Sequence, residues 1–274
     1  MPVVTVTREM GSQGKEVARG VSEALGVPLI CHQIVDQLAD RVRLRKSQVM
    51  RLLDGRAGIF ERMSADLTSL AIFAAEEIVN AALQDNGAVI RGWGATQLLR
   101  EMPSVVCVRV CAPFEVRKQR MLERLGAQDA DKVAEDIRNN DEAYAAITRR
   151  HFSVDYTDPE KYDLVLNTQR VGVAECVDQV LRLVRSAEFA ETESARQQLH
   201  DFGLVCRVRA ALRRSPRTRD MRVTVKVQNG RVAFGGAGYG ADRRAALSEV
   251  AAAVPGVREI EDLSRTISLR ARFA

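Results

Sequence analysis

Apolar residues follow two different spacings along this chain. Short β-branched runs, such as the one beginning at Val3, predict buried strands, whereas apolar residues three or four positions apart, such as Val17, Val21 and Leu25, predict one face of a helix. The two patterns alternate over the first two thirds of the chain. The predicted strands are 3–7, 27–31, 88–90, 105–111 and 162–168, and the predicted helices are 16–25, 32–51, 64–84, 114–125, 130–152 and 173–184.

Strands that alternate with helices in this order predict a parallel sheet covered by helices on both faces. We therefore expect a three-layer α/β domain over residues 1–187. A polar segment follows, with glutamates among small residues, and it is either a linker or the exposed start of a helix. We place the linker at 188–199.

The remaining residues, 200–274, predict a small α+β domain. Leu204, Val208 and Leu212 indicate a helix, and alternating valines predict a strand over 223–227. Asn229-Gly230 is typical of a hairpin turn. A second strand at 232–234, a second helix ending before Pro255-Gly256 and a last strand within 257–273 complete this domain.

The composition is that of a globular protein, with 46% hydrophobic and 28% charged residues in 274. No apolar run is long enough to span a bilayer, and the N-terminus begins a strand rather than a signal sequence, so we expect a cytoplasmic protein. Five cysteines without a C-x-x-C pair argue against a disulfide framework. The three histidines form no metal-ligand pattern.

Positive charge is concentrated near the C-terminus. The chain carries a net charge of +5, which divides into +8 from residue 201 onward and −3 before it. Such asymmetry suggests an anionic partner for the C-terminal domain, either lipid headgroups or nucleic acid. A solvated arginine-rich surface is the alternative.

The segment after the first strand has the outline of a phosphate-binding loop. Gly11 and Gly14 allow backbone N–H groups to turn toward an anion, and Lys15 adds a positive charge at the start of a helix. Glu9 and Glu16 depart from the Walker A pattern, because they occupy the positions of its first glycine and its hydroxyl residue. A simple glycine turn between strand and helix is the alternative.

Arginines follow two further strands. Arg91 comes at the end of strand 88–90, where open parallel sheets bind ligands, although a surface arginine is the alternative. Trp93 follows it and either stacks on a base or packs in the core. Arg117, Arg120 and Arg124 share one face of helix 114–125, which suits a clamp on transferring phosphates or a solvated basic face.

Four motifs in order make residues 1 to about 187 resemble the cytidylate kinase-like family of P-loop proteins. These motifs are the loop from Thr7 to Glu16, Arg91-Gly92-Trp93-Gly94, the strand and Ala-Pro turn before Arg117, and the stretch from Asp158-Pro159 to Thr168. The resemblance implies an ATP-dependent nucleoside monophosphate kinase with Mg²⁺, acting on CMP or dCMP.

The resemblance also implies roles for individual residues. Gly11, Ser12, Gln13, Gly14 and Lys15 would hold the donor phosphates. Arg91 and Asp141 would bind the acceptor, and Lys15, Arg117, Arg120 and Arg124 would be catalytic. No metal ligand is identified.

Two departures from the family pattern keep a second function open. Cytidylate kinases proper have an arginine where this chain has Trp93, and another where it has Tyr144. A catalytically inactive nucleotide sensor that regulates or localises the C-terminal domain is therefore the alternative.

Residues 200 to about 268 resemble a BON domain, through the strand from Val223, the Asn229-Gly230 turn and Val254-Pro255-Gly256-Val257. This resemblance implies an anionic membrane surface or a small ligand as partner, rather than nucleic acid. The sequence does not indicate an oligomeric state.

Overall fold

The computed structural model describes residues 2–31, 33–42, 44–53, 66–92, 94–236 and 239–261. The chain divides into two compact units, Met1–Thr192 and Glu193–Ala274, and each is described by itself. His32 and Trp93 lie outside the described residues.

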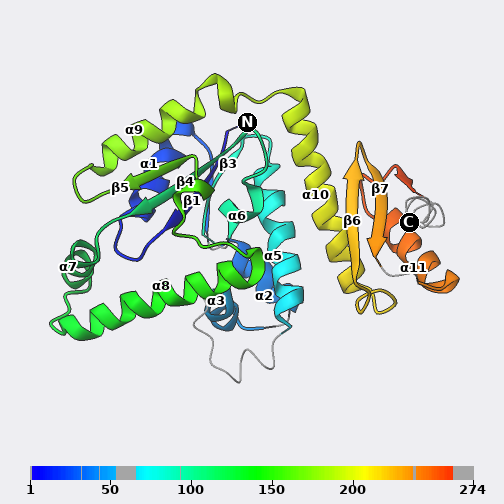
Figure 1. The fold of residues 1–274 in the computed structure, drawn as a ribbon, viewed down its shortest axis with the longest axis horizontal. Coiled ribbons are helices and arrows are strands. Elements are labelled where there is room, and N and C mark those ends of the chain that lie inside the picture. Colours follow the sequence, from blue (N-terminus) through cyan, green and yellow to red (C-terminus); the bar gives the residue numbers. More distant parts are fainter. Residues whose placement is uncertain are drawn as a thin grey trace, which may run out of the picture. The chain divides into compact units, whose positions relative to one another are not determined.

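Unit 1 is built on a parallel sheet whose strands follow the order β2-β3-β1-β4-β5 (Figure 1). The central strand β1 pairs with β3 from Val3 opposite Ala88, and with β4 from Val3 opposite Val105. The carboxyl ends of these strands therefore meet at one edge of the sheet. The strands are β1 (Val3–Arg8), β2 (Leu29–Ile30), β3 (Ala88–Arg91), β4 (Val105–Cys111) and β5 (Leu164–Asn167).

Helices cover both faces of this sheet, which confirms the predicted α/β class. Helices α1 (Gly14–Leu25) and α9 (Val173–Val184) pack on one face, where alternate strand residues such as Val4 and Val6 form the core. Helices α5 (Leu67–Ala82) and α6 (Ala95–Leu99) pack on the other.

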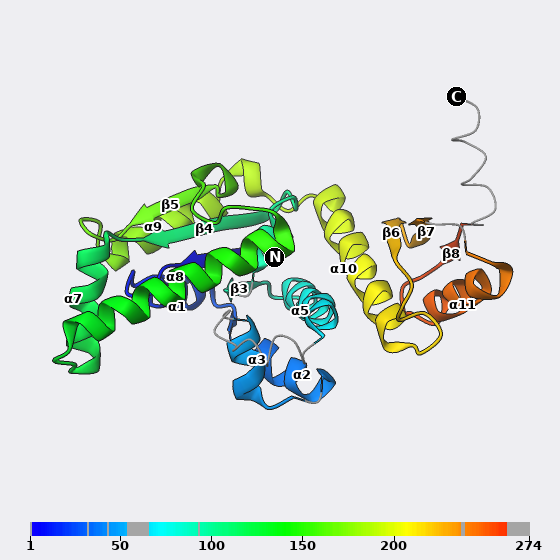
Figure 2. The same cartoon turned by 60° about the horizontal axis from the view of Figure 1, so that its bottom comes forward.

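Four more α-helices lie in the described part of unit 1, together with short 3-10 helices at Pro159–Lys161 and Ala187–Phe189. Helices α2 (Gln33–Val42) and α3 (Lys46–Leu53) group with α5 beside β3 (Figure 2). Helix α7 (Phe114–Leu125) follows β4, and α8 (Ala130–Phe152) packs on α7 and α6. The short helix α6 was not expected from the sequence, because its five residues are too few to show a helical spacing.

The prediction of one helix over 32–51 is wrong. Helix α2 ends at Val42 and α3 begins at Lys46. The side chain of Gln48 accepts a hydrogen bond from the backbone N–H of Arg45 at 3.0 Å, which caps a new helix start. The apolar spacing continues across this break, so it could not reveal it.

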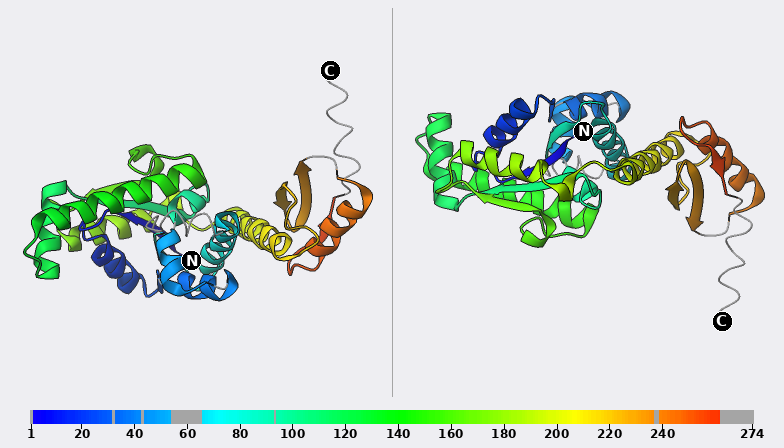
Figure 3. Two further views of the ribbon diagram at one scale, coloured as in Figure 1. Left: turned by 90° about the horizontal axis from the view of Figure 1, so that it is seen from below. Right: turned by 90° about the horizontal axis from the view of Figure 1, so that it is seen from above.

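The described part of unit 2 contains two helices and a small sheet (Figure 3). Strands β6 and β7 form an antiparallel hairpin through Asn229 and Gly230, and β8 pairs with β7 in parallel. Leu204 and Val208 of α10 share the core with Phe234 of β7 and Leu247 of α11. The elements are α10 (Glu193–Arg214), β6 (Val223–Gln228), β7 (Arg231–Gly236), α11 (Ala241–Ala252) and β8 (Glu259–Ile260).

The polar segment before residue 200 is in part the start of a helix rather than only a linker. Residues 193–199, predicted as the end of a linker, are the first two turns of α10, because Ala195 and Leu199 are buried helical positions. Within the range 257–273 predicted as strand, β8 covers Glu259–Ile260, and residues 262–273 lie outside the described part.

Candidate functional site

The loop between β1 and α1 requires glycine at two positions. Gly11 has a φ of +82°, and a Cβ there would lie 2.7 Å from the carbonyl oxygen of Arg117. A Cβ at Gly14 would lie 2.5 Å from the Cβ of Arg8. Gly14 is the first residue of α1, so the first turn of that helix directs N–H groups without intrahelical acceptors into the loop.

Ser12 fixes the shape of this loop from inside. Its buried hydroxyl donates to the carbonyl oxygens of Glu9 at 2.8 Å and Val110 at 3.0 Å. Its backbone N–H donates to the Glu9 carbonyl oxygen at 3.2 Å. Because these donors already have partners, Ser12 supports the loop in this structure and does not line the pocket beside it.

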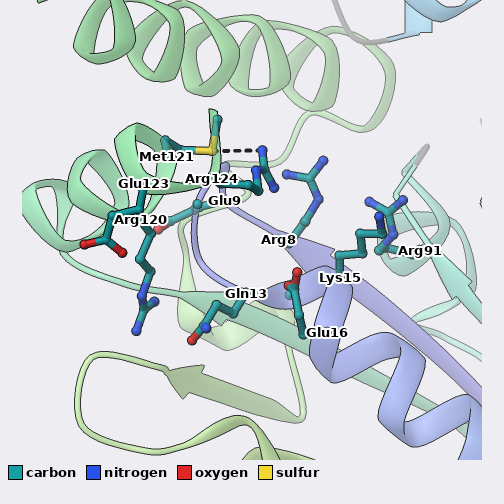
Figure 4. A pocket seen from close by; sticks show the side chains of 12 residues that line it. Arg8, Glu9, Gln13, Lys15, Glu16, Arg91, Arg120, Met121, Glu123 and Arg124 are labelled. Carbon is teal, nitrogen blue, oxygen red and sulfur yellow. Dashed lines mark hydrogen bonds between the residues drawn. The ribbon is translucent and has the colours of Figure 1, made fainter. Parts of the chain in front are cut away.

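A pocket of about 540 Å³ opens beside the loop (Figure 4). Basic side chains from separate elements gather around it, and Figure 4 shows Lys15 and Arg91 on one side and Arg120 on α7 on the other. Such a site favours a polyanion. The lining residues are Arg8, Glu9, Gly11, Gln13, Gly14, Lys15, Glu16, Arg91, Arg120, Met121, Glu123 and Arg124.

Arg91 reaches the pocket from the carboxyl end of β3. Its Nε atom is buried and has no hydrogen-bond partner among the described residues. A buried donor without an acceptor is costly, so an anion bound here would satisfy it.

The carboxylate of Glu9 is held by residues outside the β1–α1 loop. One oxygen accepts from Arg109 Nη2 at 2.6 Å, and the other accepts from the Ala112 N–H at 3.3 Å and lies 3.5 Å from Arg117 Nε. The loop is therefore not closed by this acidic side chain.

Arg117 is buried away from the pocket. Its Nε donates to the Ala112 carbonyl oxygen at 3.1 Å, and Nη1 donates to that of Met10 at 3.3 Å. Both terminal nitrogens donate to the carboxylate of Asp141, at 3.2 and 2.8 Å. The structure thus places Arg117 and Asp141 together, but neither lines the pocket.

The other two arginines of α7 do line the pocket. Arg120 donates to the hydroxyl and carbonyl oxygens of Thr168, both at 2.8 Å, and the Thr168 hydroxyl donates to the Ser12 carbonyl oxygen at 2.9 Å. Arg124 Nη2 lies 2.9 Å from the sulfur of Met121. Of the predicted site residues, the pocket brings together Gly11, Gln13, Gly14, Lys15, Arg91, Arg120 and Arg124, and it does not include Ser12, Arg117 or Asp141.

Arg8 and Thr168 were missed by the sequence analysis. Both stand at or just after the carboxyl end of a parallel strand, Arg8 ending β1 and Thr168 following β5. Strand ends at this edge of an open sheet are where ligands bind, and that signal could have identified them.

Tyr144 stands in a group of aromatic side chains. Its hydroxyl lies 3.5 Å from that of Thr7, and its ring meets Tyr156 edge to face with centroids 4.9 Å apart. Burial raises the pKa of the Tyr156 hydroxyl, so that group stays protonated at neutral pH. The guanidinium of Arg109 lies over the ring of Tyr156, 5.8 Å from its centroid.

Within the described part of the chain, no three His, Cys, Asp or Glu side chains gather as a metal would require. Nor do the described helices include one with the length and hydropathy needed to cross a membrane.

Known proteins resemble this chain in sequence and in fold. A cytidylate kinase of Methanothermobacter thermautotrophicus is 26% identical over 168 residues, which cover 61% of this chain and 96% of that protein. A crystal structure of an uncharacterized protein from Eubacterium ventriosum has a TM-score of 0.53 at 19% identity, over 68% of this chain and 99% of that one. A shikimate kinase from Bacteroides thetaiotaomicron has a TM-score of 0.43 at 17% identity, over 68% of this chain and 99% of that one. The sequence model of the cytidylate kinase-like family matches residues 3–170, more than half of the chain, and the protein therefore belongs to that family.

Proposed function

We propose that unit 1 transfers the γ-phosphoryl group of ATP to a nucleoside monophosphate, with CMP and dCMP as the first candidates. The observation that carries this proposal is the gathering of two loop glycines, Lys15 and four arginines around one pocket. Phosphoryl transfer depends mainly on positioning and on neutralising charge, and these residues are suited to both. The name of the Methanothermobacter thermautotrophicus relative supports CMP as the acceptor.

Separate residues would serve the two substrates. The loop from Gly11 to Lys15 would hold the donor phosphates through backbone N–H groups and one ammonium. Arg91 would bind the acceptor phosphate from β3. Arg120 and Arg124 would approach the transferred group from α7, because both line the pocket.

Three carboxylates line this pocket, and Glu16 is the one that fits Mg²⁺, because Glu123 already accepts a hydrogen bond from Gln119 Nε2 at 2.8 Å. Glu16 follows Lys15 and lines the pocket, whereas Glu9 is held by Arg109 and Arg117. A carboxylate oxygen is a ligand that Mg²⁺ prefers, with phosphate oxygens and waters as the others. When bound, the ion would neutralise charge on the β- and γ-phosphates.

The test is ATP consumption with a panel of nucleoside monophosphates. We expect turnover with CMP or dCMP, and a loss of about 10³-fold in Lys15→Ala, because a charge that stabilises the transition state is removed. Arg19→Ala is the matched control, since Arg19 is an exposed cation of the same helix. Turnover that survives Lys15→Ala would contradict the assigned role.

A nucleotide sensor without turnover is the second candidate. It is supported by Tyr144, which is held in an aromatic group where cytidylate kinases proper have an arginine. In that case ATP would raise the thermal midpoint of the wild-type protein, Lys15→Ala would abolish the shift, and no acceptor would support ADP release.

We propose a BON-type binding role for unit 2, directed at an anionic membrane surface or a small ligand. Part of its basic charge is neutralised internally, since Arg217 pairs with Glu249 and Arg243 with Asp220. Flotation of the full chain with anionic vesicles, and not with neutral ones, would support the membrane surface. Binding to DNA or RNA with a steep salt dependence would instead indicate nucleic acid.

A further inference from the structure

The loop and the α7–α8 pair are joined by a partly buried ion cluster. Glu9 belongs to the loop, Arg109 to β4, Arg117 to α7 and Asp141 to α8, so four elements meet here. The side chains are 11%, 11%, 7% and 24% exposed, in that order. Two cations face two anions, and the cluster is electrically balanced.

Arg117 connects the Glu9–Arg109 pair to Asp141. Its guanidinium holds Asp141 through two hydrogen bonds and also donates to the Met10 carbonyl oxygen inside the loop. Its own carbonyl oxygen is the atom that a Cβ at Gly11 would meet. A displacement of Arg117 would therefore reach the loop both through a hydrogen bond and through direct contact.

The same helix presents the arginines that line the pocket. Arg120 and Arg124 lie one and two turns beyond Arg117 on α7. Met10 of the loop also packs against the apolar cluster formed by Met121 of α7 with Val133 and Ile137 of α8. The position of α7 over the phosphate loop thus depends on how Arg117 is held.

We propose that Arg117 and Asp141 are positioning residues: Asp141 acts through Arg117 to hold the loop and α7 in register, rather than by touching the acceptor. This inference rests on the proposed function. It differs from the role that the resemblance to cytidylate kinases implies for Asp141, and it explains why neither side chain lines the pocket.

Asp141→Asn separates the two roles. If Asp141 positions the loop, the variant loses about 10²-fold in kcat and binds ATP more weakly, while the KM for the acceptor changes less than twofold. If Asp141 touches the acceptor, the KM for CMP rises and ATP binding is unchanged, which would overturn the inference. Glu142→Gln, at the next and exposed position of α8, is the control and should match the wild type.

A double variant tests the same inference in case Asp141→Asn does not fold. Arg117→Leu/Asp141→Leu removes both charges together, and such apolar replacements of buried pairs are often tolerated. It should fold and show the same weakened ATP binding. Unchanged ATP binding in a folded double variant would overturn the inference.

A measurement without nucleotide distinguishes this inference from the proposed function. Amide hydrogen exchange over residues 9–14 should be faster in Asp141→Asn than in the wild type and in Glu142→Gln. If wild-type protein shows no phosphoryl transfer, the proposed function fails while this exchange difference still tests the positioning role. Equal exchange in all three proteins would overturn the positioning role.

Discussion

Gly11 is the residue of the β1–α1 loop at which an added Cβ would meet the backbone of α7. Its φ of +82° is a conformation that side chains rarely adopt, and a Cβ would also overlap the Arg117 carbonyl oxygen at 2.7 Å. We expect Gly11→Ala to lower the free energy of unfolding by more than the roughly 1 to 2 kcal/mol of left-handed strain alone, and to weaken ATP binding. Urea unfolding and calorimetric titration with ATP measure the two effects.

Gly126 provides the matched control. It has a φ of +59° at the end of α7, and nothing lies within 4 Å of a Cβ built there. Gly126→Ala should therefore show the strain without the overlap and leave ATP binding intact. Equal losses in the two variants would mean that the approach to Arg117 is not what requires glycine at position 11.

Cys107 gives a prediction on pH. Burial raises the pKa of its thiol from 9.0 to about 12, so the folded protein keeps the proton over a range in which the unfolded chain loses it. Stability should therefore fall as pH rises above about 9, because the unfolded state binds fewer protons there. Unfolding free energies at pH 8 and 9.5 should differ less in Cys107→Ala than in the wild type. An equal difference in both proteins would assign the pH dependence to other groups.

Residue types predicted the pocket only in part. Lys15 and Arg91 were found because strand ends and glycine turns are visible in sequence, and both line the pocket. The shared face of Arg117, Arg120 and Arg124 was also visible, but helical spacing does not say where a residue points. Arg117 became a buried ion-pair residue because Asp141, 24 residues away, lies beside it in the fold.

Helix α8 carries Asp141 to its partner, and its start depends on one side chain. Asp129 Oδ1 accepts a hydrogen bond from the Lys132 N–H at 2.9 Å, which satisfies one of the free donors of the first turn. Asp129→Ala should lower the free energy of unfolding by about 1 kcal/mol. Chemical denaturation of unit 1 measures this loss.

Asp136 is the control for this cap. It is an exposed carboxylate within the same helix, and Asp136→Ala removes the same charge without touching the helix start. Its stability should stay within about 0.5 kcal/mol of the wild type. A loss as large as that of Asp129→Ala would point to the charge rather than the cap.

The spacing of apolar residues predicted the long helices and strands well, but it did not predict where one helix ends and the next begins. The strands around β1 and the helices α1, α7, α8 and α9 fall where the spacing places them. The break between α2 and α3 depends on a side-chain cap at Gln48, and apolar spacing does not record such a cap. Periodicity therefore missed the break between α2 and α3, which it spans without interruption, and the five-residue helix α6.

The whole molecule consists of two units with separate cores. Unit 1 forms its core between the sheet and helices such as α1 and α9, and unit 2 forms its core from α10, β6, β7 and α11. The charge asymmetry seen in the sequence coincides with this division, since the basic residues from position 201 onward belong to unit 2. The spacing of apolar residues placed the second domain at 200–274, and the polar residues before it did not show that α10 begins at Glu193.

Helix α10 should decide whether unit 2 folds alone. Leu204, Val208 and Leu212 of this helix belong to its buried core, and the Asp201 carboxylate accepts from the backbone N–H groups of Asn229 and Gly230 at 2.7 and 3.1 Å. We expect residues 193–274 to unfold cooperatively on heating, and residues 215–274, which lack α10, to show no transition. Circular dichroism measures both.

A pair of adjacent substitutions tests the same point without truncation. Val208 is fully buried and Arg209 is exposed, so Val208→Asp places an unpaired charge in the core of unit 2 while Arg209→Asp changes only the surface. In the fragment 193–274, Val208→Asp should abolish the transition and Arg209→Asp should keep it. If both variants melt like the parent fragment, α10 is not part of the core that stabilises unit 2. The residues from Glu193 to Arg214 would then not be needed for unit 2 to fold.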